Sequence, residues 1–340
     1  MAEYPGRGRT AKVVAGIGDD CAVLQFRPGH DSLVTTDFSL EGIHFRRDWH
    51  PPESIGHRCL ARGLSDIAAM GGEPVAAFLS LALPRDLPQA WLDRFMEGLL
   101  SLAAEYRVTL AGGDTAESSN GILADIVVVG SVPSGKAILR SGARPGDRIY
   151  VSGALGGSAA AIVQFQNPSH PERPRAGAPS LSRSARQGGE FDSARSSEEK
   201  PNHRTYPRHF YPEPRLEPGR ILRQKRLATA MIDTSDGLST DLAHICEESK
   251  VGAEISAQLI PRARVDKPAR EVPLELALHG GEDYELLFTA PASKRIPAQI
   301  AGVPLTYIGV ITRTPAPGIF LRSAEGVSQL EVHGWEHFKG

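Results

Sequence analysis

Five segments of the chain share one local design, in which aliphatic residues, glycines and hydroxyl residues surround a carboxylate. They read G-I-G-D-D from Gly16, T-T-D-F-S-L-E-G-I-H-F from Thr35, L-S-D-I-A-A-M-G-G from Leu64, A-G-G-D-T from Ala111 and I-D-T-S-D-G from Ile232. Aliphatic runs bounded by glycine and polar turns are typical of strands and helices in an α/β protein. The design therefore predicts several acidic turns at the ends of buried elements.

The stretch 33–45 concentrates most of this chemistry. Leu33 and Val34 begin a buried strand, and two threonines, two carboxylates and one histidine follow within ten residues. Oxygen ligands at a strand end suit Mg²⁺, which binds one or two carboxylates and keeps room for phosphate oxygens. Taken alone, the stretch is equally consistent with a strand that leads into an acidic surface turn.

Three further carboxylate positions support a metal site. Asp66 lies near the end of a predicted helix, where the helix dipole favours cations, so an acid there needs a metal or a basic partner. Asp114 follows paired glycines whose N–H groups could bind phosphate. Asp233 and Asp236 surround a turn before a helix, and an N-cap role would explain only one of the polar residues in that turn.

Hydrophobic spacing and breakers predict the remaining elements. We expect helices at 53–71, 88–106, 153–165, 219–230, 238–249, 274–278 and 293–301, and strands at 75–83, 108–110, 122–132, 148–152, 253–257, 284–288, 305–312 and 318–322. The fold class is α/β, of the α+β type. The length of 340 residues favours two domains, which we place at 1–152 and 153–340.

One phosphate-binding pattern is rejected. Residues 130–136 match G-x-x-x-x-G-K, but the following residue, Ala137, is not Ser or Thr, and Pro145 prevents a regular helix soon after. Arg140 and Arg144, in the next loop, are candidates for contacts to ATP phosphates.

Composition excludes several classes of protein. The formal net charge of -2 gives no electrostatic basis for binding nucleic acid or an anionic membrane. The chain has neither a long apolar span nor a signal-peptide core, so we expect a cytoplasmic protein. Its three cysteines form neither a zinc pattern nor a disulfide framework. Residues 166–203 are rich in Pro, Ser, Gly and Arg, which indicates a flexible insertion.

Together the five motifs form a carboxylate cage with too little basic charge to hold a nucleotide directly. Such a cage needs positive charge from metal ions. A reaction that brings two anionic phosphates together needs several Mg²⁺ ions at once.

The sequence resembles the thiamine-monophosphate kinase family, within the superfamily of aminoimidazole-ribonucleotide synthetase. The resemblance runs from about residue 16 to 338, apart from the insertion, and its most specific motifs are T-T-D-F-S-L-E-G-I-H-F and G-G-E-D-Y-E-L-L-F. It implies transfer of the γ-phosphoryl group of ATP, the co-substrate, to thiamine monophosphate. It also implies an N-terminal mixed sheet with helices that pairs across a homodimer, a C-terminal α/β domain, and active sites in the cleft.

The resemblance also implies site residues. The metal ligands would be Asp20, Thr35, Thr36, Asp37, Asp66, Asp114, Asp233 and Asp236, with Asp19 an alternative to Asp20. Contacts to ATP would come from Gly113, Asp114, Arg140 and Ser235, and contacts to thiamine monophosphate from His44, Glu282 and Trp335. Glu41 is left either as support for a neighbouring group or as a solvated acid.

Two departures from the family pattern stand out. The fifteen residues before Gly16 do not show the helix that family members usually carry there, and the 166–203 insertion is longer and more basic than the usual linker. The alternatives are another ATP-dependent synthetase of the superfamily or an inactive nucleotide-binding regulator. Relatives that act through terminal cysteines are disfavoured because the chain has none at its ends.

The ionisation state of the acceptor phosphate also leads to an expectation about the mechanism. A phosphate oxygen is already ionised near neutral pH. We therefore expect no dedicated catalytic residue, only in-line transfer driven by alignment and Mg²⁺. His44 would position the acceptor.

Overall fold

The first half of the chain forms a mixed sheet covered on one face by two helices. The computed structural model describes residues 11–18, 21–166, 204–265, 269–313 and 318–334. The elements of this half are β1 (Ala11–Ala15), β2 (Val23–Phe26), β3 (His30–Leu40), α1 (Pro52–Ala69), β4 (Glu73–Leu83), α2 (Gln89–Glu105), β5 (Thr109–Glu117) and β6 (Leu123–Pro133). The sheet order is β3-β6-β4-β5, with only the β4–β5 pair parallel, while β1 and β2 form a separate hairpin.

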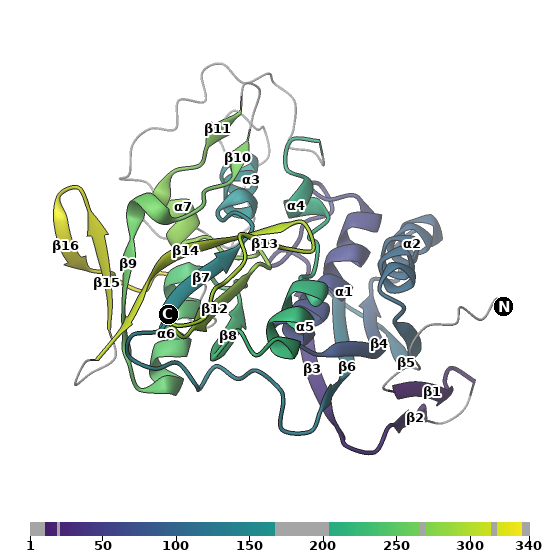
Figure 1. Ribbon diagram of the computed structural model, residues 1–340. Helices are drawn as coiled ribbons and strands as arrows, with labels where there is room; N and C mark the ends of the chain where they lie inside the picture. The colour runs from purple at the N-terminus through teal and green to yellow at the C-terminus, as the bar shows by residue number, and fades with distance from the viewer. Residues whose placement is uncertain (1–10, 19–20, 167–203, 266–268, 314–317, 335–340) are drawn as a thin grey trace.

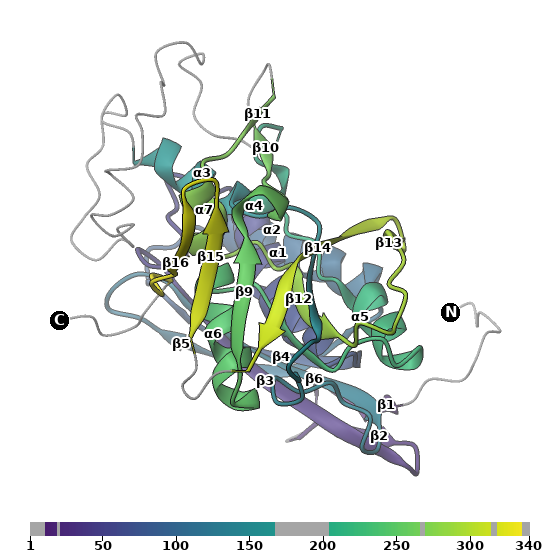
Figure 2. The same cartoon turned by 60° about the vertical axis from the view of Figure 1, so that its left-hand side comes forward.

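The second half is built around an eight-stranded sheet. Its elements are β7 (Arg148–Ser152), α3 (Gly157–Phe165), α4 (Pro207–Phe210), α5 (Leu216–Gln224), β8 (Ala230–Asp233), α6 (Leu238–Ser249), β9 (Gly252–Ser256), η2 (Ala257–Leu259), β10 (Arg264–Val265), β11 (Arg270–Glu271), α7 (Leu274–His279), β12 (Leu286–Ala290), β13 (Gln299–Ile300), β14 (Val303–Thr312), β15 (Ile319–Ser323) and β16 (Gly326–Gln329). The main path is β16-β15-β9-β14-β7-β12-β8, with β13 paired to β14. Figure 2 shows β16, β15, β9 and β14 side by side.

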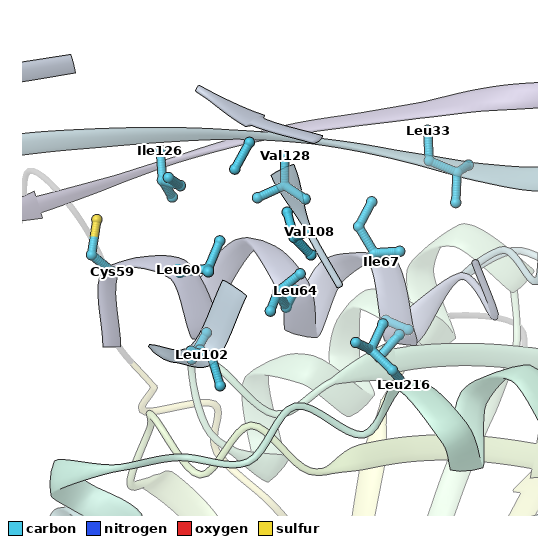
Figure 3. Packing of buried hydrophobic residues seen from close by; sticks show 14 of the residues in the cluster. Leu33, Cys59, Leu60, Leu64, Ile67, Leu102, Val108, Ile126, Val128 and Leu216 are labelled. Carbon is cyan, nitrogen blue, oxygen red and sulfur yellow. The ribbon is translucent and has the colours of Figure 1, made fainter. Parts of the chain in front are cut away.

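Helix α1 joins the two halves. Its apolar side chains Leu60, Leu64 and Ile67 pack against the first sheet, where Figure 3 shows Val128 and Leu33 facing them. The other side of α1 contacts α5 and β8 (Figure 1). One hydrophobic cluster therefore continues from the first sheet through α1 into residues of α5, β8 and β12.

The predicted elements agree with most of this fold, with four exceptions. The helix expected at 219–230 spans Leu216–Gln224, because residues 230–233 instead form β8 and pair with β12. No helix forms at 293–301, where Pro297 interrupts the segment and turns lead into β13. The strand expected from Tyr284 begins at Leu286 and is fully buried rather than half-buried.

The fourth exception concerns the two strands that pass through acidic motifs, at residues 33–45 and 111–115. Strand β3 continues to Leu40, so Thr35, Thr36 and Asp37 lie inside a strand rather than at its end. Similarly, β5 runs through the whole A-G-G-D-T motif to Glu117. In both strands, cross-strand hydrogen bonds to β6 or β4 outweigh the turn character of the local sequence.

The predicted domain division stays a prediction. Strand β7 precedes the boundary at residue 152 but pairs with β12 and β14 in the second sheet. A division just before Arg148 keeps both sheets whole. In the described parts of the chain, no helix has the length and apolar content needed to cross a membrane.

Candidate active site

Strand β3 presents its polar residues on two opposite faces of the first sheet. Side chains alternate along a strand, and Thr35 and Asp37 point toward α1, where Thr35 donates a hydrogen bond to Asp66. Thr36 points to the other face and donates to Asp125 at 2.7 Å. The three consecutive predicted ligands therefore do not face one site.

Helix α1 provides a polar stripe beside its apolar one. Arg58, Arg62, Ser65 and Asp66 recur at three- and four-residue spacing and so lie on one side of the helix. Each of them bonds a predicted site residue from another element. The prediction missed Arg58 and Arg62, although their four-residue spacing toward Ser65-Asp66 was a usable signal.

Arg62 and Asp37 form an ion pair between α1 and β3. The Nε and Nη2 groups of Arg62 both donate to Asp37 Oδ1, at 3.1 and 2.8 Å. Burial alone would lower the pKa of Arg62, but Tyr284, Asp37 and Glu282 outweigh burial and raise that pKa. Arg62 therefore stays charged, and one oxygen of Asp37 is held in a fixed direction.

The turn between β8 and α6 supplies the C-terminal acids. Ser65 Oγ donates to Asp233 Oδ2 at 2.7 Å, which ties this turn to α1. Helix α6 has Gly237 as its N-cap, without a side-chain capping bond. The N-cap alternative for Asp233, Ser235 and Asp236 is therefore wrong.

The carboxylates on this side of the sheet lie close enough to affect one another. Burial raises the pKa of Asp66 to about 6, and Asp37 adds to the rise while Thr35 and Arg140 oppose it. Burial raises the pKa of Asp233 to about 8, with further contributions from Asp66, Asp37 and Asp236. Such mutual repulsion marks a group of acids that requires added positive charge.

Glu282 joins this group through its loop. Its backbone N–H donates to the Ser235 carbonyl oxygen at 2.8 Å. A Cβ atom on Gly281 would collide with that same carbonyl, which explains the glycine before Glu282. Glu282 itself has a φ of 63°, a strained conformation of the kind that functional loops retain.

Two arginines control the charge of Glu282. Burial by itself would raise its pKa, but Arg58 and Arg62 lower it, and His44 adds to their effect. Arg58 Nη2 donates to Glu282 Oε2 at 2.8 Å, and Arg58 Nη1 donates to the His209 carbonyl. Glu282 is therefore an ionised carboxylate in a fixed position near His44.

The acids that follow Glu282 in the same motif are structural. Asp283 accepts hydrogen bonds from the N–H groups of Gly156 and Ser158 at the start of α3. Glu285 is fully buried, where Arg215 binds both of its oxygens and Ser152 binds one. The motif G-G-E-D-Y-E thus combines one site residue with two residues that hold the fold.

Asp114 and Gly113 lie apart from these acids. Asp37, Ile126, Leu79 and Gly113 occupy one row across the four strands, so Asp37 and Gly113 are roughly 14 Å apart. Asp114 is exposed and pairs with Ser80, in the row that contains Asp125. It therefore shares the face of Thr36 rather than that of Asp66. Asp20, the alternative Asp19, and Trp335 lie outside the described residues.

Arg140 and Glu41 have different roles. Arg140 lies near enough to Asp66 to lower its pKa. Glu41 accepts a hydrogen bond from Arg47 at 2.6 Å and one from the Ile122 N–H at 3.0 Å. Glu41 therefore anchors the loop after β3 instead of being a solvated acid.

The donor set fits Mg²⁺ that is shared with phosphate. Within the described residues, no three His, Cys, Asp or Glu side chains are arranged to hold a metal ion by themselves. This is compatible with Mg²⁺, which is usually bound by one or two carboxylates plus phosphates and water. Asp241, whose pKa burial, Asp233 and Asp236 raise, also has a buried Oδ1 without a hydrogen-bond partner in the described chain.

Known proteins match the chain over nearly its whole length. The family described as AIR synthase related protein, N-terminal domain, matches residues 18–132, and its C-terminal counterpart matches residues 144–322. The thiamine-monophosphate kinase of Escherichia coli K12 is 37% identical, and the match covers 99% of this chain and 97% of that protein.

Two solved structures share the fold. The crystal structure of thiamine-monophosphate kinase from Stenotrophomonas maltophilia has 34% identity and a TM-score of 0.73, and 91% of each chain is covered. A structure described as AaThiL complexed with AMPPCP and TMP has 29% identity and a TM-score of 0.71, and covers 92% of this chain and 89% of its own. The chain belongs to the thiamine-monophosphate kinase family, among the AIR synthase-related proteins.

Proposed function

We propose that this chain transfers the γ-phosphoryl group of ATP to thiamine monophosphate, giving thiamine diphosphate and ADP. The observation that carries the proposal is the group of Asp37, Asp66 and Asp233, brought from β3, α1 and β8 to one place beside the Arg58–Glu282 pair. The printed names of its relatives, together with the AMPPCP and TMP of AaThiL, support the same reaction.

Asp37, Asp66 and Asp233 would hold Mg²⁺ ions together with the phosphates. When bound, the ions neutralise the negative charge on both phosphate groups and stabilise the transferred phosphoryl group. Thr35 fixes Asp66, Arg62 fixes Asp37, and Ser65 fixes Asp233. These bonds orient the ligands before the substrates arrive, which lowers the cost of reorganisation during transfer.

The remaining predicted contacts complete the proposal. Thr36 and Asp114, on the opposite face of the first sheet, would serve as further metal ligands, and so would Asp20. Gly113, Asp114, Arg140 and Ser235 would contact ATP. His44, Glu282 and Trp335 would contact the acceptor. None of these groups removes a proton, because the attacking phosphate oxygen of the acceptor is already ionised near neutral pH.

The proposal includes a homodimer in the cytoplasm. The face of the first sheet opposite α1 exposes Val34 and Phe38, with 68% and 53% of their surfaces accessible. Exposed aliphatic and aromatic side chains on an open sheet face support pairing with a second copy. Burying this face would also enclose Thr36 and Asp125.

A coupled assay of ADP release tests the reaction. The purified chain receives ATP and Mg²⁺ with thiamine monophosphate, with thiamine, or with no acceptor. We expect ADP release only with the monophosphate. Equal release with thiamine would contradict the proposed acceptor, and binding of ATP without any turnover would indicate a regulator instead.

A further inference from the structure

Arg62 uses only part of its guanidinium group to hold Asp37. The Nε and Nη2 groups both donate to the same oxygen of Asp37. The third nitrogen, Nη1, donates to no group in the part of the chain that the structure describes. The side chains of Arg62 and Asp37 are 15% and 25% exposed, so the pair borders open space.

The charge around Arg62 differs from the charge around Asp233. The charged groups that act on Asp233 are the carboxylates Asp66, Asp37 and Asp236. Around Arg62, by contrast, two guanidinium groups face two carboxylates, because Arg58 binds Glu282 and Arg62 binds Asp37. The site thus has one part that requires added cations and one part that is neutral without them.

The neutral part matches the charges of the acceptor. Thiamine monophosphate combines a cationic thiazolium ring with an anionic phosphate. Glu282, whose side chain is 19% exposed, offers the negative charge. Arg62 offers N–H donors in the planar geometry that binds phosphate oxygens well. Arg62 binds Asp37, where the acceptor phosphate must meet the metal ions, and lies near enough to Glu282 to lower its pKa.

We infer that Arg62 binds the phosphate of the acceptor through Nη1 while Nε and Nη2 hold Asp37, and that this contact makes the site select the monophosphate over thiamine. The inference rests on the proposed function and adds a specificity residue to it. Asp37 keeps Oδ2 for a metal ion. The Arg62–Asp37 pair therefore orients both a metal-binding carboxylate and the acceptor phosphate.

Equilibrium binding without metal and without turnover tests this role. Isothermal titration measures the affinity of thiamine monophosphate, thiamine and ATP for the parent, for Arg62→Gln and for Arg62→Lys. A charge-assisted hydrogen bond contributes about 1.5 to 3 kcal/mol, which corresponds to a roughly ten- to hundred-fold loss of monophosphate affinity in Arg62→Gln. Thiamine and ATP affinities should stay unchanged, and Arg62→Lys should recover part of the loss.

Two controls separate the contact from indirect effects. Arg94→Gln removes a surface arginine that is paired with Glu53 through Nη2, and this variant should bind all three ligands like the parent. Removing Arg62 also leaves the Asp37 charge unbalanced, so Arg62→Gln is combined with Asp37→Asn. The double variant should lose monophosphate affinity, whereas Asp37→Asn alone should keep it.

The possible outcomes are distinct. If Arg62→Gln keeps the parent's preference for the monophosphate, or weakens thiamine equally, the inference is overturned while the proposed function stands. A selective loss of ATP affinity would assign Arg62 to the donor phosphates and overturn it as well. If the metal-free parent shows no preference for the monophosphate, the inference is overturned too, whereas the coupled assay of ADP release with Mg²⁺ tests the acceptor separately.

Discussion

At the scale of single residues, the site is defined by how each acid is balanced. In the described part of the chain, Asp37 and Glu282 have arginine partners, whereas the side-chain donors to Asp66 and Asp233 are hydroxyl groups. Hydroxyl groups orient a carboxylate but do not neutralise it. The unbalanced acids are therefore the ones whose behaviour should depend on pH and on Mg²⁺.

Asp233→Asn should remove part of the pH dependence of stability. The folded-state pKa of Asp233 is raised to about 8. An acid with a raised pKa stabilises the fold while it is protonated, and that contribution is lost as the pH rises from about 4, its ordinary pKa, to about 8. Asparagine resembles the protonated form, so the variant should lose less stability than the parent across this range.

Urea unfolding between pH 5 and 8.5, first without divalent cations and then with Mg²⁺, measures the difference. Mg²⁺ should restore the stability of the parent at high pH and have a smaller effect on the variant. If the stability of the two proteins depends on pH in the same way, the pKa of Asp233 is not raised in the folded state.

His44 gives a second prediction at this scale. Its Nδ1 atom accepts a hydrogen bond from the Leu40 N–H at 3.1 Å, and it lies near Glu282. If His44 positions the acceptor, His44→Gln should raise the KM for thiamine monophosphate and leave the shape of the pH–rate profile unchanged. A parent profile with a limb near pH 6.5, the ordinary pKa of histidine, that vanishes in the variant would instead identify His44 as a base.

At the scale of elements, the sequence pattern predicted the helix whose ends depend on local interactions, but not the lengths of strands that depend on pairing. The apolar spacing of residues 53–71 predicted α1, and the structure gives Pro52–Ala69. The spacing could not predict that β3 and β5 continue through their acidic motifs, because pairing with β6 and β4 decides this. Since side chains alternate along those strands, the same pairing separates Thr36 and Asp114 from Asp37, which motif order alone did not indicate.

The packing of α1 on α2 depends on two glycines that no pattern in the sequence singled out. A Cβ atom on Gly56 would collide with the Phe95 carbonyl oxygen, and one on Gly98 with the Glu53 carbonyl oxygen. Glycine is unfavourable inside a helix, so its presence there indicates close contact between the two backbones. This contact fixes the position of α1, which carries the site residues Arg58, Arg62, Ser65 and Asp66.

Gly56→Ala should therefore destabilise the protein even though alanine favours helices. Forcing the two helices apart should lower the free energy of unfolding by about 1 to 3 kcal/mol. Chemical denaturation of Gly56→Ala and of Ser101→Ala, an exposed position of α2, checks this. A variant as stable as the Ser101→Ala control would mean that α1 and α2 are less tightly packed than described.

At the scale of the whole molecule, the site requires both halves of the chain. Strand β3 and α1 supply Asp37 and Asp66, while the β8–α6 turn and the loop before β12 supply Asp233 and Glu282. The shared hydrophobic cluster holds these elements together. The motifs predicted the family and most of the acids, but not the partners of the α1 arginines, because helical spacing shows which residues share a face and not what they bind.

The central claim is that the acids facing α1 support phosphoryl transfer to thiamine monophosphate. The most direct measurement is ³¹P NMR of the reaction of ATP and thiamine monophosphate with Mg²⁺, for the parent and for Asp37→Asn. The parent should convert the monophosphate resonance into the two resonances of a diphosphate, with one ADP formed per product, and Asp37→Asn should form none. ATP loss without thiamine diphosphate, or full conversion by Asp37→Asn, would contradict the account.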